Sequence, residues 1–164
     1  MKKIIWAIIF VVILIAGVWW YVGRDERAIK KTIREVASYA SSEAGKSDIA
    51  IAVASQNLAQ RFTEDAQIKW RWPDWPKIKT GEETLVGRDK IRESALVAKR
   101  TGNVKFEVTE LKAETGPRAG EGSATATILV HFTDTGDLAT FQTTFNLTKT
   151  SRWQIKSVNA LSFT

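Results

Sequence analysis

Hydrophobic residues fall into three successive patterns along the chain, and the first is an unbroken apolar run, Ile4–Val22. At about 1.5 Å of rise per residue, a helix over this run is roughly 28 Å long, close to the ~30 Å hydrocarbon core of a membrane. Lys2 and Lys3 precede the run, and the charges of residues 23–27 balance, so the positive-inside rule predicts a cytoplasmic N-terminus. We therefore expect residues 1–23 to form a transmembrane anchor that contacts membrane lipid.

A cleavable signal peptide is the alternative interpretation of the apolar run. Such a peptide needs a shorter apolar core and small residues at its cleavage site, whereas the pair Ala16-Gly17 is followed by the bulky residues 18–22. The chain also has no cysteine to which a lipid could be attached. A retained anchor is therefore favoured, which in a bacterium places the chain in the inner membrane with residues 24–164 as a periplasmic domain.

The second pattern has the period of a helix. Apolar residues recur at three- and four-residue spacing over three segments: Arg24–Ala44, Ser47 or Asp48 to about Phe62, and Arg88–Arg100. Gly102 follows the last of these segments and is a typical helix terminator. The sequence leaves open whether the first helix continues the membrane segment or breaks from it at Gly23.

Between the second and third helices, Ala66–Trp72 alternates apolar and polar residues at the period of a half-buried strand. Pro73 ends this strand, and Pro73–Pro76 predicts a turn. We expect Lys77–Val86 to form an exposed loop or a short hairpin.

The third pattern has a period of two and continues from Gly102 to the end of the chain. Long alternating segments joined by short turns predict an antiparallel meander of strands. A change of phase near Thr109-Glu110 predicts a β-bulge. In the last strand, the residues expected to face the core are Trp153, Ile155, Leu161 and Phe163.

Composition limits the chemistry that the chain can carry out. The formal net charge is +6, and across a membrane a modest positive charge fits anionic lipid headgroups better than nucleic acid, so no nucleic-acid partner is expected. With no cysteine and one histidine, the chain offers neither a disulfide framework nor the ligands of a typical zinc site. We therefore expect no metal and no cofactor.

The order helix, helix, strand, helix and then a meander resembles the cone-shaped α+β fold of the nuclear transport factor 2-like (NTF2-like) superfamily, which includes SnoaL-like and ketosteroid isomerase-like proteins. Three local motifs are similar to those of this superfamily: Asn57–Ile68 at a helix-to-strand junction, Gly87–Glu93 at the start of the third helix, and Arg152–Val158 at the start of the last strand. The resemblance implies about three helices packed on a curved, mostly antiparallel sheet over residues 24–164.

The resemblance also implies a pocket between the sheet and the helices, where the isomerases use a tyrosine and two carboxylates. Tyr39 matches the tyrosine, but Trp70 stands near the position of the base and Thr143 near that of the second acid. With both carboxylates missing, isomerase chemistry has no proton acceptor here. A binding or assembly role is therefore favoured over catalysis.

Three polar side chains are candidate pocket groups under the rival hypothesis, an enzyme or carrier for a small apolar molecule. Tyr39 could line the pocket or form a hydrogen bond within the core, and Asp65 could point into the pocket mouth or cap the turn before the first strand. His131 could act as a general base or donor, or lie on the surface of the sheet. The structural interpretation is favoured for each of the three.

Tryptophans interleaved with basic residues form the most distinctive stretch after the anchor. Trp70, Trp72 and Trp75 are candidate ligand-binding residues, because aromatic and basic side chains together bind sugars and polyanions. The alternative, favoured here, is that Trp70 and Trp72 belong to the core. A cone filled by Trp70, Trp72 and Trp153 would exclude the enzyme hypothesis, whereas an open cone with converging polar groups would favour it.

Polar residues gather on the second face of the predicted meander, at Thr125, Thr127, Thr140, Gln142 and Thr144. Threonine-rich faces suit polar contacts of moderate strength, so this face could form a homodimer or bind another envelope protein. The leading hypothesis is a single-pass, membrane-anchored binding or assembly domain without catalytic activity.

Overall fold

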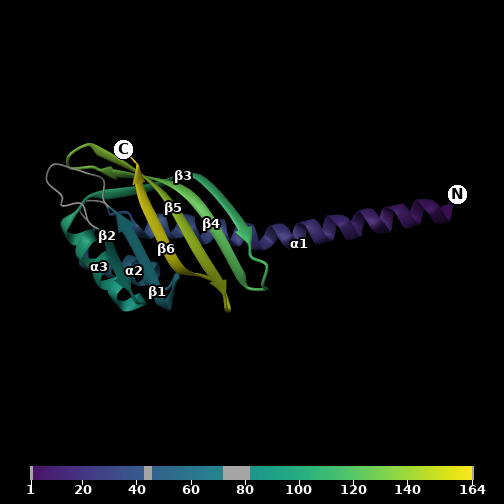
Figure 1. The fold of residues 1–164 in the computed structure, drawn as a ribbon, viewed down its shortest axis with the longest axis horizontal. Coiled ribbons are helices and arrows are strands. Elements are labelled where there is room, and N and C mark those ends of the chain that lie inside the picture. The colour runs from purple at the N-terminus through teal and green to yellow at the C-terminus, as the bar shows by residue number, and fades with distance from the viewer. Residues whose placement is uncertain (1, 43–45, 72–81, 164) are drawn as a thin grey trace.

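A long helix, α1 (Lys2–Ala40), leads from the N-terminal end of the chain into a layered α+β domain (Figure 1). The computed structural model describes the backbone of residues 2–42, 46–71 and 82–163, and within these segments it leaves undescribed the side chains of residues 2–10, 14–16, 18–22, 101 and 162–163. α1 is continuous through Gly23, so the helix does not break at the position that the sequence left open. Its N-terminal part extends away from the domain, and its C-terminal part belongs to it (Figure 1).

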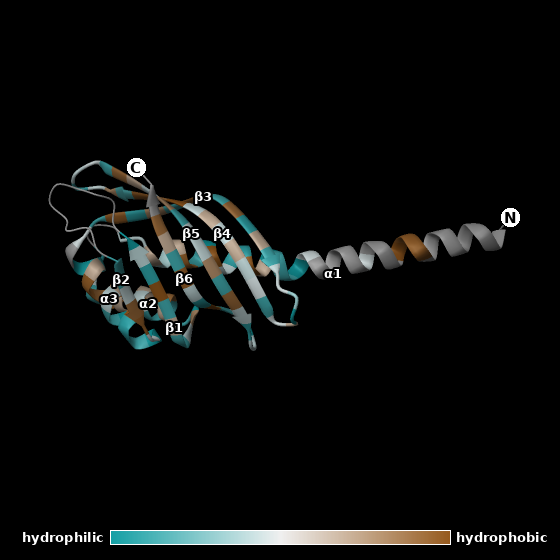
Figure 2. Cartoon of the chain, in the orientation of Figure 1, coloured by the Kyte–Doolittle hydropathy of each residue, from teal (hydrophilic) through white to brown (hydrophobic). Residues whose placement is uncertain are grey.

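Figure 2 shows a strongly hydrophobic stretch in the projecting part of α1. The side chains of Val11, Val12 and Ile13 in this helix are exposed. Among the described residues, no helix combines the length and the apolar character that crossing a membrane requires. Most side chains of the predicted lipid-contacting segment, Ile4–Val22, lie outside the described residues. The anchor over residues 1–23 stays a prediction.

Six strands in the described part of the chain form one curved sheet. They are β1 (Phe62–Arg71), β2 (Glu82–Val86), β3 (Val104–Thr115), β4 (Glu121–Phe132), β5 (Asp137–Lys149) and β6 (Trp153–Phe163). Their order across the sheet is β2-β1-β6-β5-β4-β3, and the neighbours are antiparallel except β1 and β6, which are parallel. The predicted antiparallel meander from β3 to β6 is confirmed, and β2 pairs antiparallel with β1.

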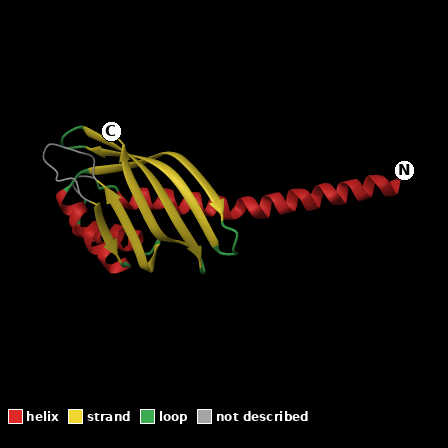
Figure 3. Ribbon diagram, viewed as in Figure 1, coloured by secondary structure: helices red, strands yellow, loops and turns green. Residues whose placement is uncertain are grey.

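α1, α2 (Asp48–Ala59) and α3 (Arg88–Thr101) cover one face of this sheet (Figure 3). The hydroxyl of Ser47 caps α2, because it accepts a hydrogen bond from the backbone N–H of Ala50 at 3.3 Å. α1 ends at Ala40 rather than at the predicted Ala44. The reason is that the backbone N–H of Ser42 donates to the carbonyl of Val104 at 2.7 Å, which draws the chain away from the helix.

β1 begins at Phe62 rather than at Ala66, and α2 ends before it, so both predicted boundaries were wrong. Phe62 is buried, and the backbone N–H of Ile155 donates to the carbonyl of Arg61 at 2.8 Å, so pairing with β6 starts directly after the helix. The register of β1 against β6 is irregular between Phe62 and Gln67. This irregularity disturbs the alternation from which the strand was predicted.

The bulge predicted near Thr109-Glu110 is confirmed in β3. Val108 pairs with Ile128, whereas Glu110 pairs with Thr127, so Thr109 is the additional residue. The bulge moves Leu111 and Ala113 onto the face that carries Val108, which is why the alternation changes phase there.

A second irregularity, in β6, was not predicted. Leu147 pairs with Ile155 while Asn146 pairs with Ser157, which leaves an additional residue, Lys156, in β6. Residues after this point change faces, so Leu161 is 49% exposed and the prediction that it faces the core was wrong. The side chain of Phe163 lies outside the described residues.

The core forms where the apolar stripe of α1 meets the sheet. Ile29 and Ile33 are 0% and 1% exposed, and Trp153 is buried at 4% as predicted. Gly122 in β4 makes this packing possible, because a Cβ atom there would lie 2.6 Å from Ile29 Cδ1 and 3.0 Å from the Trp153 ring.

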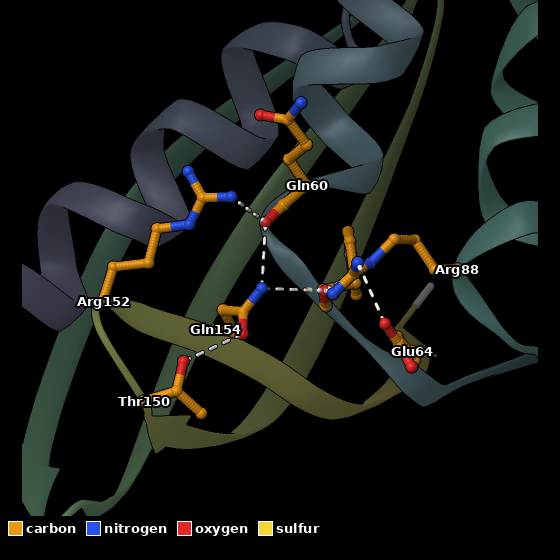
Figure 4. Close-up of polar contacts among 7 residues, drawn as sticks. Gln60, Glu64, Arg88, Thr150, Arg152 and Gln154 are labelled. Carbon is orange, nitrogen blue, oxygen red and sulfur yellow. Dashed lines mark hydrogen bonds and ion pairs between the residues drawn. The ribbon is translucent and has the colours of Figure 1, made fainter.

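Three segments that are distant in sequence meet where α2 passes into β1 (Figure 4). Arg88, at the start of α3, donates from Nε and Nη2 to the carbonyl of Phe62 at 2.9 and 2.7 Å. Gln154 donates to the carbonyls of Gln60 and Phe62 at 3.2 and 3.3 Å. Arg152 donates to the carbonyl of Gln60 at 3.1 Å. The three motifs behind the family resemblance therefore belong to one hydrogen-bonded cluster that joins α2, α3, β1 and β6.

Candidate functional site

A cavity of about 420 Å³ lies between the helices and the inner face of the sheet. Its described wall is almost entirely apolar, and representative residues are Ile33 and Ala37 of α1, Ile91 of α3, and Phe106, Phe141 and Phe145 of the sheet. Trp70 lines this wall, whereas Trp153 belongs to the core packed around Ile29 and Gly122. Within the described residues these two tryptophans therefore leave the cavity unfilled, and Trp72, the third tryptophan of the prediction, lies outside the described residues.

Polar groups in the described cavity wall are few, and they include Ser42, Thr143 and the indole of Trp70. The Ser42 hydroxyl donates to the carbonyl of Gly102 and accepts from the backbone N–H of Val104, so it is satisfied. The Thr143 hydroxyl and the Trp70 indole nitrogen are buried without a hydrogen-bond partner in the described structure. Because nearly all buried polar groups in proteins are paired, these two atoms mark a place where a polar ligand atom would be stabilised.

The strand register places Trp70 and Thr143 in one row across the sheet. Trp70 of β1 pairs with Ala160 of β6, and Ala160 pairs with Thr143 of β5. On its other side, Thr143 pairs with Ala126 of β4. The alternation of buried residues along β5 puts Thr143 on the inner face with Phe141. Small side chains therefore flank Thr143 on both sides of this row.

The three predicted pocket groups, Tyr39, Asp65 and His131, do not converge on the cavity, and none belongs to its described wall. The Tyr39 ring lies 6.0 Å from the Arg61 guanidinium, and Arg61 forms an ion pair with Glu35 at 3.0 Å. Asp65 is exposed on β1. Tyr39 therefore lies beside Arg61 rather than in the described cavity wall, and Asp65 lies within β1 rather than in a turn before it.

His131 lies half-buried on the outer face of β4, with Nε2 3.5 Å from a carboxylate oxygen of Glu107 on β3. This acidic neighbour was not predicted, because only the pairing of β3 with β4 brings the two residues together. Trp72 and Trp75, the other two candidate ligand-binding tryptophans, lie outside the described residues.

The predicted polar face is present on the outer side of the sheet. Thr125 pairs with Thr144, and Thr127 pairs with Gln142, so these four side chains form two adjacent rows. Within the described segments, no group of three or more metal-ligating side chains lies close enough to hold a metal ion.

Comparisons with known proteins agree with this fold. No known protein family matches the sequence, and no curated protein matches it either. A nuclear transport factor 2-like protein with a cystatin-like fold from Novosphingobium aromaticivorans superposes with a TM-score of 0.65 at 12% identity, covering 90% of this chain and 88% of that one. A protein of unknown function with a cystatin-like fold from Nostoc punctiforme superposes with a TM-score of 0.62 at 9% sequence identity. The match covers 85% of this chain and 91% of that protein.

A proposed scytalone dehydratase from Novosphingobium aromaticivorans gives a TM-score of 0.59 at 14% identity, covering 84% of this chain and 83% of its own. At such low identities the likeness shows the fold alone. The domain thus has the α+β nuclear transport factor 2-like fold, which is shared by enzymes and by binding proteins, and the resemblance inferred from the three motifs is confirmed at the level of the fold.

Proposed function

We propose that the chain is a membrane-anchored, non-catalytic binding protein that holds a small, mainly apolar molecule in the cone. The observation that carries this proposal is the cavity of about 420 Å³. Ligand sites typically have volumes of roughly 300–1,000 Å³, apolar walls and a few well-placed polar groups. The cavity has all three properties, with Thr143 and Trp70 as the polar groups that need a partner.

The composition of the cavity wall supports a binding function without catalysis. The described residues that line it are apolar or uncharged. General acid–base catalysis requires a titratable group within hydrogen-bond distance of the reacting atom, and Thr143 and Trp70 do not titrate near neutral pH. A molecule that enters this part of the cone would be held and released unchanged.

The proposed anchor rests on the apolar run Ile4–Val22. Two features support it: α1 continues without a break from this run into the domain, and Val11, Val12 and Ile13 are exposed on the projecting part. With Lys2 and Lys3 in the cytoplasm, the domain would lie on the periplasmic side of a bacterial inner membrane. An apolar carrier at that place could exchange its ligand with the bilayer.

The test uses the full chain in lipid nanodiscs and equilibrium dialysis of tetralin, a compact hydrocarbon that fits the cavity. Nanodiscs with the chain are expected to bind tetralin in excess of empty nanodiscs. Ala160→Leu, which fills the cavity from the sheet side, is expected to remove this excess. Ala52→Leu, at an exposed position of α2, serves as the matched control and should leave it unchanged. Equal binding by empty and loaded nanodiscs would contradict the proposal.

A second proposal concerns self-association through the outer face of the sheet. Leu161, 49% exposed, pairs with Gln142 and so adds an apolar contact to the polar rows of Thr125, Thr127, Gln142 and Thr144. A homodimer would bury this face, with another envelope protein as the alternative partner. Lysine substitutions at Thr127 and Gln142 are expected to convert dimers of the full chain to monomers in sedimentation. A wild-type chain that stays monomeric at high concentration would exclude the homodimer.

A further inference from the structure

We propose that Trp70 and Thr143 together bind the oxygen acceptor of a neutral ligand, such as a ketone, ester or ether whose remaining surface is apolar. This inference rests on the proposed function, because it names the chemical class of the molecule that the cavity holds. It assigns a specific role to the two buried polar groups of the wall that lack a partner in the described structure.

The two groups lie in register on one face of the sheet. Both pair with Ala160, which stands between them on β6. Because neighbouring strands are about 4.8 Å apart, the Cα atoms of Trp70 and Thr143 are separated by roughly 10 Å. Between them stands only the methyl side chain of Ala160.

The chemistry of the two side chains selects an acceptor. An indole N–H only donates, and a threonine hydroxyl can donate while its position adapts to the partner. A carbonyl or ether oxygen has two lone pairs and can accept from both. The described wall offers no charged side chain to balance an ionic ligand, and burial of an unpaired charge is strongly unfavourable, so the ligand is neutral.

The residues around Trp70 and Thr143 are consistent with a ligand that is apolar apart from its oxygen acceptor. The residues around the row on the inner face, including Phe141, Phe145 and Ile128, are apolar and line the cavity. They would contact the hydrocarbon part of the ligand. A hydrocarbon without oxygen would fill the same space but would leave the Trp70 and Thr143 donors unpaired.

The experiment compares 1-tetralone with tetralin, two molecules that share a carbon skeleton and differ in one carbonyl group. Their association constants with the full chain in phosphatidylcholine nanodiscs are measured by equilibrium dialysis, with empty nanodiscs subtracted. The quantity of interest is the ratio of the tetralone constant to the tetralin constant. This ratio is expected to fall about 3- to 10-fold in Thr143→Val and in Trp70→Phe, which corresponds to the loss of one hydrogen bond.

The matched controls are Thr143→Ser, which keeps the hydroxyl and should preserve the ratio, and Thr84→Val, at an exposed position of β2 outside both proposed binding surfaces. Tetralin binding should change less than twofold in Thr143→Val, because valine has nearly the same shape as threonine. If both molecules bind but the ratio is the same in every variant, the acceptor site is disproved while the binding function stands. If neither molecule binds the wild-type chain above empty nanodiscs, both proposals are overturned.

Discussion

The indole N–H of Trp153 donates to the carboxylate of Asp25 at 3.2 Å, a contact between residues 128 positions apart. The ammonium of Lys149 donates to the same oxygen at 2.7 Å and lies 5.8 Å from the centre of the Trp153 ring. These contacts fix α1 to the β5–β6 turn close to the point where the helix leaves the domain.

Removal of the Asp25 carboxylate should therefore weaken the domain. Asp25→Ala leaves the buried Trp153 N–H without its acceptor and removes the ion pair with Lys149. Both charged side chains are about one-third or more exposed, so solvent screens the ion pair. We expect a loss of about 1–2 kcal/mol in the free energy of unfolding, measured by urea denaturation. Glu83→Ala, at an exposed position of β2, is the control and should change it by less than ~0.5 kcal/mol.

Because of the Asp25 carboxylate, we expect the free energy of unfolding to depend on pH. The hydrogen bond from Lys149 lowers the pKa of Asp25, partial burial opposes this, and the Trp153 N–H adds to the lowering. Because the pKa is lower in the folded state, the stabilisation is complete above the ordinary value of about 3.9 and is lost as the pH falls through the folded pKa.

Urea denaturation of wild type and Asp25→Asn over this range tests the prediction. The difference in the free energy of unfolding should be constant from about pH 7 to 5 and should shrink below about pH 4. A difference that is independent of pH down to 3 would show that Asp25 does not carry this effect.

Gly122 should be intolerant of a side chain. Its Cβ would lie 2.6 Å from Ile29 Cδ1, so Gly122→Ala is expected to lower the free energy of unfolding by about 1–3 kcal/mol. Ile29→Val removes the clashing Cδ1 atom, and the double variant should be more stable than the sum of the single effects predicts. Strict additivity in this double-mutant cycle would argue against the direct contact.

Substitution of Thr143, in contrast, should raise the free energy of unfolding. Its buried hydroxyl has no partner in the described structure, so Thr143→Val is expected to stabilise the empty protein by about 1 kcal/mol. Thermal unfolding of ligand-free protein would measure the gain. Thr144→Val, on the exposed face, should have little effect. A loss of stability in Thr143→Val would mean that the hydroxyl is already satisfied in the folded chain.

Local patterns predicted the elements and their order because each depends on neighbours in sequence. The Ser47 cap, the end of α3 at Gly102 and the Thr109 bulge all follow from short-range rules. The three motifs of the family resemblance were informative because they meet around the carbonyl of Phe62, at the junction that sets the fold.

Features that depend on strand pairing were not predictable in this way. The exposure of Leu161 follows from an additional residue in β6, and the proximity of His131 to Glu107 follows from pairing of β3 with β4. Alternation identified the inner face correctly but could not show whether the space above it is filled. The family resemblance implied a pocket, and the polar residue Thr143 at a core position between Phe141 and Phe145 was a local signal of the same cavity.

Mass spectrometry of the small molecules that co-purify with the full chain from its native membrane in nanodiscs tests directly whether the cavity holds a ligand. We expect a neutral, largely apolar molecule with an oxygen acceptor, at close to one per chain in wild type and Ala52→Leu and strongly depleted in Ala160→Leu. Recovery of the same molecules in the same amounts from wild type, Ala160→Leu and empty nanodiscs would contradict it.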